Sequence, residues 1–340
     1  MNLKHFIFLA LPSALFADAI TPGSYTTSLD QGENITIRKT VTISQAPPTS
    51  AKVDVFFLTD ATGSMGSLIN SVKSSATQIF TNTASLGDVS FGVGEYRDIY
   101  DSFTYRLNTD TTNDLDAVQS GINQWNASGG DDWPEANLYA LEQVAKETSW
   151  RDASTRILVW FGDAPGHDPR SGSTEASAIE ALQSDKIVVE ALNIRDLDEY
   201  GQATRVAEAT GGDLWNGAVT SNIVEVIGDA IEQVFQNYNT VSLEAVGNEP
   251  GVGVSIAPVE YTGTYDRSEE RTFDFDVTFT GIEEGTHSFS INALVDGGIV
   301  ATESDIITVN SANVPEPLSI VFLGMSLLTL CGYRLNYRKK

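Results

Sequence analysis

The most informative hydrophobic pattern in the chain is a short apolar segment that ends in polar side chains. Residues 53–58 read VDVFFL, and their apolar side chains would cover both faces of an extended segment, which is typical of a central parallel strand. Asp60, Thr62 and Ser64 follow at alternate positions, accompanied by glycines that allow a sharp turn into a helix. Because ligands bind at the carboxyl ends of strands in open α/β sheets, we predict a binding site in this loop.

Strand and helix patterns then alternate regularly through residues 51–239. Apolar residues at helical spacing follow the polar loop directly. Further strands are predicted at residues 89–93, 156–161 and 187–192, and further helices at residues 115–125, 136–145, 176–182, 204–209 and 223–235. This order predicts one α/β domain with a doubly wound, mostly parallel sheet, similar to the Rossmann arrangement.

From residue 240 onwards, apolar and polar positions alternate, as in half-buried strands. Residues 273–279 and 289–295 both show this pattern, and glycine-containing turns separate them. We predict that residues 240–313 form an immunoglobulin-like β-sandwich, although they are few for a complete module. Residues 20–50 also contain alternating segments and are too few to fold alone. We therefore expect them to complete the sandwich, with the α/β domain inserted between its two parts.

The two ends of the chain carry patterns of sorting signals. Residues 1–19 combine Lys4, an apolar run and the sequence Ala-Asp-Ala at their end, which predicts a secretory signal peptide cleaved after Ala19. At the other end, Pro315, Glu316 and Pro317 precede an apolar segment and a basic tail within residues 314–340.

The apolar segment of this tail, residues 318–335, is short for a membrane span, which usually needs about 20 residues. The segment nevertheless favours a transmembrane interpretation. The arginine near its end can extend its charged group to the membrane surface, and basic residues follow the segment. Cys331, the only cysteine of the chain, lies in this segment, so the predicted exported body has no disulfide.

The composition excludes some classes of partner and site. The chain has 46 acidic and 20 basic residues, and a net charge of −26 makes nucleic acid an unsuitable partner. It has only three histidines, too few for a histidine-rich zinc site.

Additional oxygen ligands are expected after other segments, because one loop cannot saturate a divalent cation. The loop around Asp131, Asp132 and Glu135 contains three carboxylates, and Asp163 follows the buried strand at residues 156–161. Carboxylate and hydroxyl oxygens suit Mg²⁺ or Ca²⁺. The alternative for the acidic loop is a solvated cap with Pro134 in the first turn of a helix.

The sequence Asp60-Ala61-Thr62-Gly63-Ser64 resembles the DxTxS motif of von Willebrand factor A domains, which build the metal-ion-dependent adhesion site. Residues 132–135 (DWPE) resemble the DxPE loop of integrin β A-like domains. The resemblance implies direct ligation by the hydroxyls of the motif, and a glutamate where other A domains use a threonine. The residues so implied for the metal are Asp60, Thr62, Ser64, Glu135 and Asp163.

The same resemblance implies a second, adjacent calcium held by Asp132 and the Pro134 carbonyl, with Asp131 beside them. Integrins have paired aspartates for a third metal where this chain has Ser67 and Leu68, so no third site is expected.

The C-terminal tail resembles the PEP-CTERM sorting signal. This resemblance implies export through the inner membrane of a Gram-negative bacterium and transient anchoring through residues 318–335. It also implies processing by an exosortase near residues 315–317, and release to the cell surface or extracellular matrix.

Together these features predict a surface-associated, metal-dependent binding protein and not an enzyme. Its partner would be a protein or acidic polysaccharide that offers a carboxylate, in an exopolysaccharide or biofilm matrix. One alternative is a structural matrix protein with a stabilising metal. The other is a hydrolase using Ser64 and His167, but the G-x-S-x-G spacing of such enzymes is absent around Ser64.

Overall fold

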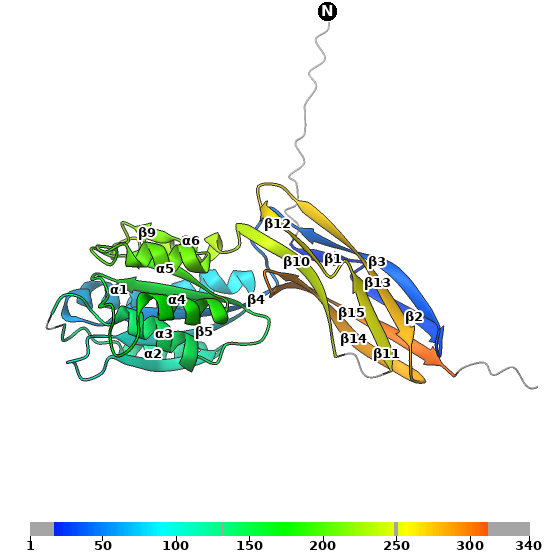
Figure 1. Ribbon diagram of the computed structural model, residues 1–340, viewed down its shortest axis with the longest axis horizontal. Helices are drawn as coiled ribbons and strands as arrows, with labels where there is room; N and C mark the ends of the chain where they lie inside the picture. The colour runs from blue at the N-terminus through cyan, green and yellow to red at the C-terminus, as the bar shows by residue number, and fades with distance from the viewer. Residues whose placement is uncertain (1–16, 131, 248–250, 312–340) are drawn as a thin grey trace, which may run out of the picture.

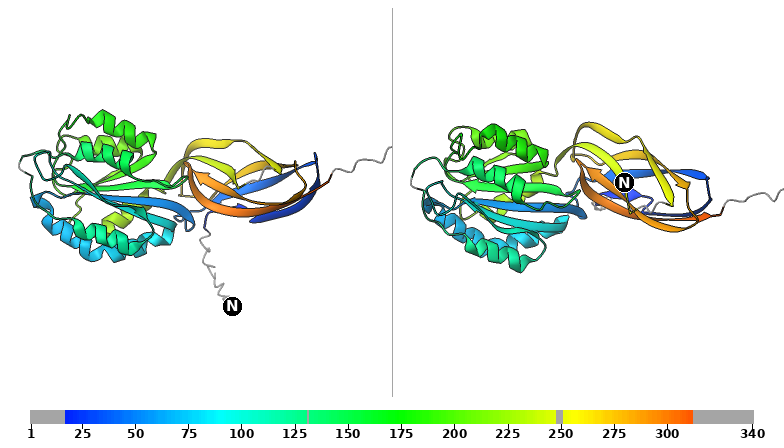
Figure 2. Two further views of the ribbon diagram at one scale, coloured as in Figure 1. Left: turned by 90° about the horizontal axis from the view of Figure 1, so that it is seen from below. Right: turned by 60° about the horizontal axis from the view of Figure 1, so that its bottom comes forward.

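A computed structural model describes residues 17–130, 132–247 and 251–311. In these ranges the chain forms two bodies, an α/β domain and an all-β sandwich, which lie end to end (Figure 1). Figure 2 shows helices on both faces of the α/β sheet, with the sandwich beyond one end of its strands.

The α/β domain contains a sheet with the strand order β6-β5-β4-β7-β8-β9. The bounds are β4 (Ala51–Asp60), β5 (Gly87–Tyr96), β6 (Tyr105–Thr112), β7 (Thr155–Gly162), β8 (Ile187–Asn193) and β9 (Leu214–Asn216). The central strand β4 runs parallel to both neighbours, β5 and β7. Only β6 is antiparallel to the strand beside it. The carboxyl ends of β4, β5 and β7 therefore meet at one edge of the sheet.

Helices cover both faces of this sheet, as the sequence predicts. They are η1 (Gly63–Met65), α1 (Gly66–Thr83), η2 (Ala84–Leu86), α2 (Leu115–Gln124), α3 (Asn137–Glu147), α4 (Glu175–Ser184), α5 (Gln202–Thr210) and α6 (Ile223–Gln233). Val55 and Phe57 pack with α1, α2 and α6, whereas Phe56 and Leu58 pack with α3, α4 and α5. The apolar segment of β4 is thus buried on both faces, which confirms its prediction as a central strand.

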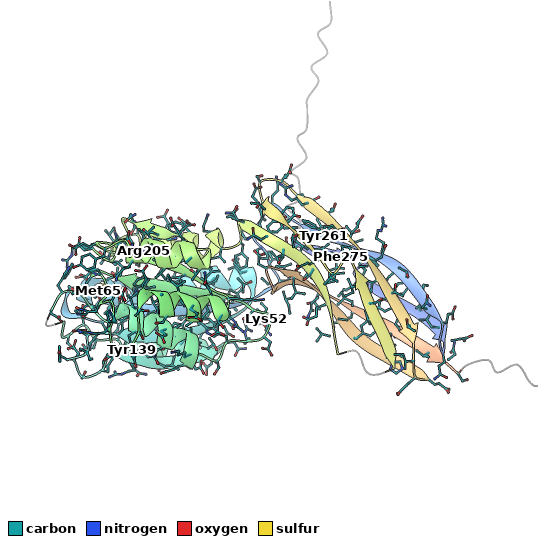
Figure 3. The ribbon with its side chains drawn as sticks, in the orientation of Figure 1. Lys52, Met65, Tyr139, Arg205, Tyr261 and Phe275 are labelled. Carbon is teal, nitrogen blue, oxygen red and sulfur yellow. The ribbon has the colours of Figure 1, made fainter. Side chains whose placement is uncertain are left out.

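The sandwich consists of the sheets β1-β3-β13-β11 and β12-β10-β14-β15-β2. The bounds are β1 (Ala19–Thr21), β2 (Ser24–Asp30), β3 (Asn34–Ile43), β10 (Asn237–Val246), β11 (Val252–Ala257), β12 (Glu260–Asp266), β13 (Arg271–Gly281), β14 (Gly285–Val295) and β15 (Gly298–Asn310). Strand β3 pairs with β13, and β2 pairs with β15, so segments from before and after the α/β domain share this body. Tyr261 and Phe275 meet edge to face in its interior, with ring centroids 5.2 Å apart (Figure 3).

Asp18 and Arg267 form a buried ion pair at one end of the sandwich. The carboxylate accepts hydrogen bonds from both terminal guanidinium nitrogens, at 2.7 and 2.8 Å, and also from the Ser44 amide at 2.8 Å. Asp18 is 4% exposed and Arg267 is 3% exposed. Cleavage after Ala19 would remove this carboxylate, whereas cleavage before Asp18 would keep it.

In the α/β domain, the predicted helices and strands are confirmed to within a few residues, and β6 and β9 are the two strands that the sequence does not predict. The tail motif Pro315, Glu316 and Pro317, the segment 318–335 and the first sixteen residues of the predicted leader lie outside the described residues. Within the ranges that are described, no helix is long and apolar enough to cross a membrane.

Glu190, in β8, makes the free energy of unfolding of the α/β domain depend on pH. The side chain is completely buried, and Trp215 donates its indole N–H to Oε2 at 2.5 Å. Burial raises the pKa of Glu190 to about 8, and the Trp215 hydrogen bond only partly opposes this. Because the folded pKa exceeds the unfolded value, Glu190 contributes stability at acidic pH that is lost as pH rises from about 4.5 through about 8.

We expect Glu190→Gln to remove a decline of about 4 kcal/mol in the free energy of unfolding between pH 5 and pH 9. Urea titrations across that range measure it. The exposed residue Glu208 provides the matched control, since Glu208→Gln should follow the wild-type profile. A Glu190→Gln profile parallel to that of the wild type would contradict the prediction.

Candidate metal centre

Asp60 is the last residue of β4 and organises the loop that follows it. One carboxylate oxygen, Oδ1, accepts hydrogen bonds from the Thr62 amide at 2.8 Å and from the Thr62 hydroxyl at 2.7 Å. The other oxygen, Oδ2, is buried and has no hydrogen-bond partner. A fully buried carboxylate oxygen without a partner is costly unless a cation or a proton satisfies it.

Ser64 links this loop to the loop after β7. Its hydroxyl donates to Oδ1 of Asp163 at 3.0 Å and lies 3.5 Å from the Thr62 hydroxyl. Asp163 is 4% exposed, and its other oxygen accepts a hydrogen bond from Arg195 at 3.2 Å. The structure thus brings Asp60, Thr62, Ser64 and Asp163 together from the carboxyl ends of two neighbouring strands.

Glu135 reaches the same place from the loop before α3. Its amide donates to the Pro165 carbonyl at 2.9 Å, and its carbonyl accepts from the His167 amide at 3.0 Å, so its backbone is held against the loop after β7. Its carboxylate is buried, with Oε2 unpartnered. A Cβ at Gly130, where φ is +81°, would lie 2.9 Å from Oε1 of Glu135 and 2.9 Å from Cβ of Thr62. Glycine at this position therefore allows Glu135 and Thr62 to come close.

The carboxyl groups here resist ionisation when no cation is present. Burial raises the pKa of Asp60 to about 7, against the opposing hydrogen bonds from Thr62. Burial also raises the pKa of Glu135 to about 9, and the negative charge of Asp60 adds to the effect. The buried Tyr96 hydroxyl has a raised pKa, chiefly through burial and then through the charge of Asp60, with smaller contributions from Glu135 and Asp163. These groups form one electrostatically coupled site.

The donors fit a hard divalent cation. The site offers carboxylate and hydroxyl oxygens and no sulfur or imidazole, the set that Mg²⁺ and Ca²⁺ prefer. It also contains two buried oxygens without partners, Asp60 Oδ2 and Glu135 Oε2. Hydrogen bonds and close contacts link Asp60, Thr62, Ser64 and Asp163, and Glu135 approaches Thr62 across Gly130, so the five residues predicted from the sequence lie in neighbouring loops and offer suitable oxygens.

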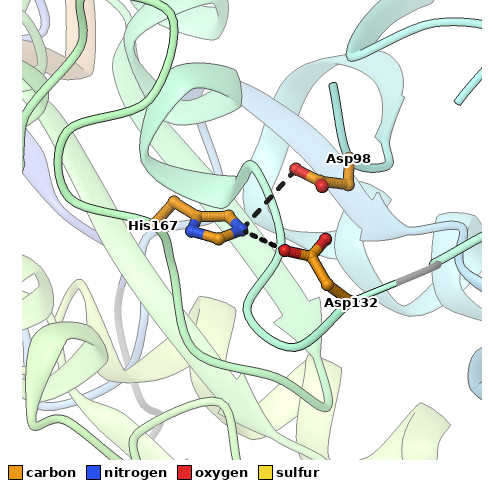
Figure 4. A group of neighbouring side chains, drawn as sticks. All are labelled: Asp98, Asp132 and His167. Carbon is orange, nitrogen blue, oxygen red and sulfur yellow. Dashed lines mark ion pairs between the residues drawn. The ribbon is translucent and has the colours of Figure 1, made fainter. Parts of the chain in front are cut away.

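A second acidic group lies nearby and differs from the one predicted. Asp98, Asp132 and His167 converge, with Nε2 of His167 3.4 Å from Asp132 and 3.9 Å from Asp98 (Figure 4). The guanidinium of Arg170 already binds Asp98 through both oxygens, at 2.5 and 2.6 Å. Burial disfavours the charged form of Asp98, but hydrogen bonds with Arg170, Asp132 and the backbone, together with the charge of Arg170, outweigh it and lower the pKa of Asp98.

The resemblance to integrin β A-like domains implies a second calcium at Asp132 and the Pro134 carbonyl, with Asp131 beside them. Asp131 lies outside the described residues, and Asp132 is found with Asp98 and His167. Asp98 is not predicted from the sequence, where its only signal is its position just after the strand at residues 89–93. The His167 side chain is 21% exposed.

The geometry does not pair Ser64 with His167. The Ser64 hydroxyl donates to Asp163, and the His167 imidazole lies against Asp98 and Asp132. A hydrolase would need the histidine as a base within hydrogen-bonding distance of its serine. No such hydrogen bond joins these two residues, both of which are described.

Residues 54–215 match the von Willebrand factor A domain family, and this part of the chain is a von Willebrand factor A domain. Its sheet order, flanking helices and strand-end loop agree with the fold expected from the Asp60 motif.

Comparison with curated proteins finds two relatives that share part of this chain. An alpha-protein kinase of Dictyostelium discoideum is 31% identical over 120 residues, 34% of this chain and 19% of the kinase. A protein named as an ariadne-like RING finger protein, from Acanthamoeba polyphaga mimivirus, is 31% identical over 145 residues, 40% of this chain and 14% of that protein. The chain thus spans under a fifth of the length of either relative.

Among solved structures, a von Willebrand factor type A protein from Catenulispora acidiphila is similar, with a TM-score of 0.47 and 13% sequence identity. The similarity covers 84% of this chain and 72% of that structure.

Proposed function

We propose that the A domain is a metal-dependent binding module that recognises a carboxylate on its partner. The observation that carries this proposal is the pair of buried, unpartnered carboxylate oxygens on Asp60 and Glu135. Divalent cation binding would supply the positive charge that this pair lacks, and would leave coordination positions for an oxygen atom of a ligand.

The residues of the site have distinct roles in this proposal. Thr62 and Ser64 contribute hydroxyl oxygens, and Glu135 contributes a carboxylate where other A domains use threonine. Asp60 orients Thr62 by accepting hydrogen bonds from its amide and its hydroxyl, and Asp163 orients Ser64 by accepting a hydrogen bond from its hydroxyl. These contacts preorganise the loop, which reduces the entropy lost when a ligand binds.

Arg195 and Trp133 supply a rim suited to an anionic partner. Arg195 is 57% exposed in its side chain and hydrogen-bonds Asp163. Its guanidinium lies 5.7 Å from the Trp133 ring centroid, and Trp133 is 42% exposed. An arginine beside the cation favours acidic partners in a chain whose net charge of −26 would otherwise repel them.

The binding experiment uses immobilised full-length protein with two probes, a polyuronate and an acidic peptide. We expect Mg²⁺- or Ca²⁺-dependent binding that EDTA abolishes. Metal-dependent stabilisation without binding of either probe would favour the alternative, a structural matrix protein with a stabilising metal. Turnover that disappears with Ser64 or His167 substitution would be required for the hydrolase alternative.

We expect Arg195→Ala to weaken binding of the acidic probe roughly tenfold, or about 1.4 kcal/mol, by removing a charge at the rim. The exposed Arg38, in the sandwich, provides a control, and Arg38→Ala should leave the affinity unchanged. Equal loss in both variants would mean that overall charge and not the rim governs binding.

Export and sorting are part of the same proposal. The leader and the three-part tail support a protein that crosses the inner membrane, is processed by an exosortase and stays at the surface or in the matrix. Mass spectrometry of the C-terminal peptide from the native host checks this. Retention of residues 318–335 in the surface-located protein would contradict it.

A further inference from the structure

A lysine and two acids are buried together between the two sheets of the sandwich. Lys39 lies on β3, and Glu303 and Asp305 lie at alternate positions on β15. The Lys39 side chain is 0% exposed, and those of the two acids are at most 1% exposed. Nζ of Lys39 is 3.0 Å from Oδ2 of Asp305 and is closer still to Oε1 of Glu303.

The surroundings are apolar and exclude water. Nζ of Lys39 lies 6.0 Å from the centroid of the Phe279 ring, which stacks on Tyr25 and packs against Phe289. Taking an ammonium and two carboxylates into such an interior is expensive, and this group also has more acids than bases. A reaction that removes two of the charges would relieve this cost.

We propose that Lys39 and Glu303 form an intramolecular isopeptide bond that joins β3 to β15. The unprotonated amine of Lys39 attacks the carboxyl carbon of Glu303 and forms the new C–N bond. The amine then loses a proton, the C–OH bond of the carboxyl group breaks, and one water leaves. The net change is amine plus carboxylic acid to amide plus water, with no oxidant or cofactor.

The two acids have different roles in this reaction. Glu303 is the acceptor because its carboxyl group is the nearer one to Nζ. Burial raises the pKa of Glu303, against the opposing effect of Lys39, and this favours the neutral acid whose hydroxyl can leave as water. Asp305 is placed to accept the proton from the amine and to pass it to the departing hydroxyl, which then leaves as water.

The bond would replace the disulfide that this sandwich lacks. Within residues 17–130, 132–247 and 251–311 there is no cysteine. Lys39 and Glu303 are 264 positions apart and belong to strands in opposite sheets, and the whole A domain lies between them in the sequence. A covalent link there would join the strand before the A domain to the last strand of the sandwich. The two strands would then stay together even when the noncovalent contacts between the sheets are broken.

Peptide mapping of the purified full-length protein tests the proposal directly. After denaturation and trypsin digestion, we expect the peptide that begins at Lys39 to be joined to the peptide that contains Glu303. The mass of the linked product should be lower than the sum of the two peptide masses by the mass of one water. Fragmentation should place the link between Nζ of Lys39 and the side chain of Glu303.

Two variants accompany the wild type. Lys39→Met and Glu303→Ala should each yield separate peptides of unmodified mass, whereas the exposed-site control Lys146→Met should retain the link. Unlinked peptides in the folded wild-type protein would overturn the proposal, and this result does not depend on whether the variants fold. A link to Asp305 would overturn the assignment of Glu303 as acceptor.

Discussion

Replacing Asp60 by alanine is expected to abolish the stabilisation of this protein by Mg²⁺ or Ca²⁺. In the wild type, a cation at one hundred times its dissociation constant should add about 2.7 kcal/mol to the free energy of unfolding. The variant should gain nothing, because it loses the unpartnered oxygen Oδ2 and also the carboxylate that orients Thr62. Thermal unfolding with and without EDTA measures the difference, which should be several degrees.

Two further variants test whether the loss of the metal response is specific to the charge of Asp60. Asp60→Asn keeps an acceptor for the Thr62 hydrogen bonds but removes the charge, and it should also lose the response to metal. Glu208→Ala, at an exposed site on α5, should respond like the wild type. Equal metal uptake by Asp60→Ala and the wild type in calorimetry would show that the cation binds elsewhere.

Replacing Asp18 by alanine should lower the free energy of unfolding of the sandwich by about 3–5 kcal/mol, because it leaves the charge of Arg267 buried without a partner. The Arg267 guanidinium is held against the backbone carbonyls of Ser44 and Phe235 and cannot reach water without breaking those contacts. Urea unfolding, followed by the intrinsic fluorescence of the sandwich tyrosines, measures the loss.

An exposed ion pair in the same body provides the control. Arg38 and Asp276 are 65% and 54% exposed in their side chains, so Asp276→Ala should cost at most about 1 kcal/mol. Similar losses in the two variants would contradict the role assigned to the buried pair. N-terminal sequencing of the mature protein belongs with this experiment, since a chain that starts at Ile20 would lack Asp18 altogether.

The α/β domain could be predicted well from the sequence because its signals are local. An apolar run on both faces of one strand predicts a central position, and polar residues after it predict the edge of the sheet where ligands bind. Asp60, Thr62 and Ser64 lie within one short motif, and Asp163 follows another buried strand. These features depend on spacing along the chain, which a sequence displays directly.

Individual side-chain contacts between distant segments could not be predicted where no motif marks the residues. Asp98 comes to Asp132 and Arg170 only because β5 lies beside β4 in the sheet, an order that periodicity does not reveal. Lys39 looks like an ordinary polar residue of an alternating strand until β3 and β15 are stacked. The cleavage pattern Ala-Asp-Ala predicts that Asp18 belongs to a leader, and only its partner Arg267, 249 positions away, shows its place in the sandwich.

The position of the cation is the central claim, and anomalous diffraction from crystals soaked in Mn²⁺ tests it most directly. Manganese suits the same oxygen ligands as magnesium and can be located by its anomalous signal. We expect the strongest peak among the side-chain oxygens of Thr62, Ser64 and Glu135. A saturating soak without a peak there, or with its only peak between Asp98, Asp132 and His167, would contradict the account.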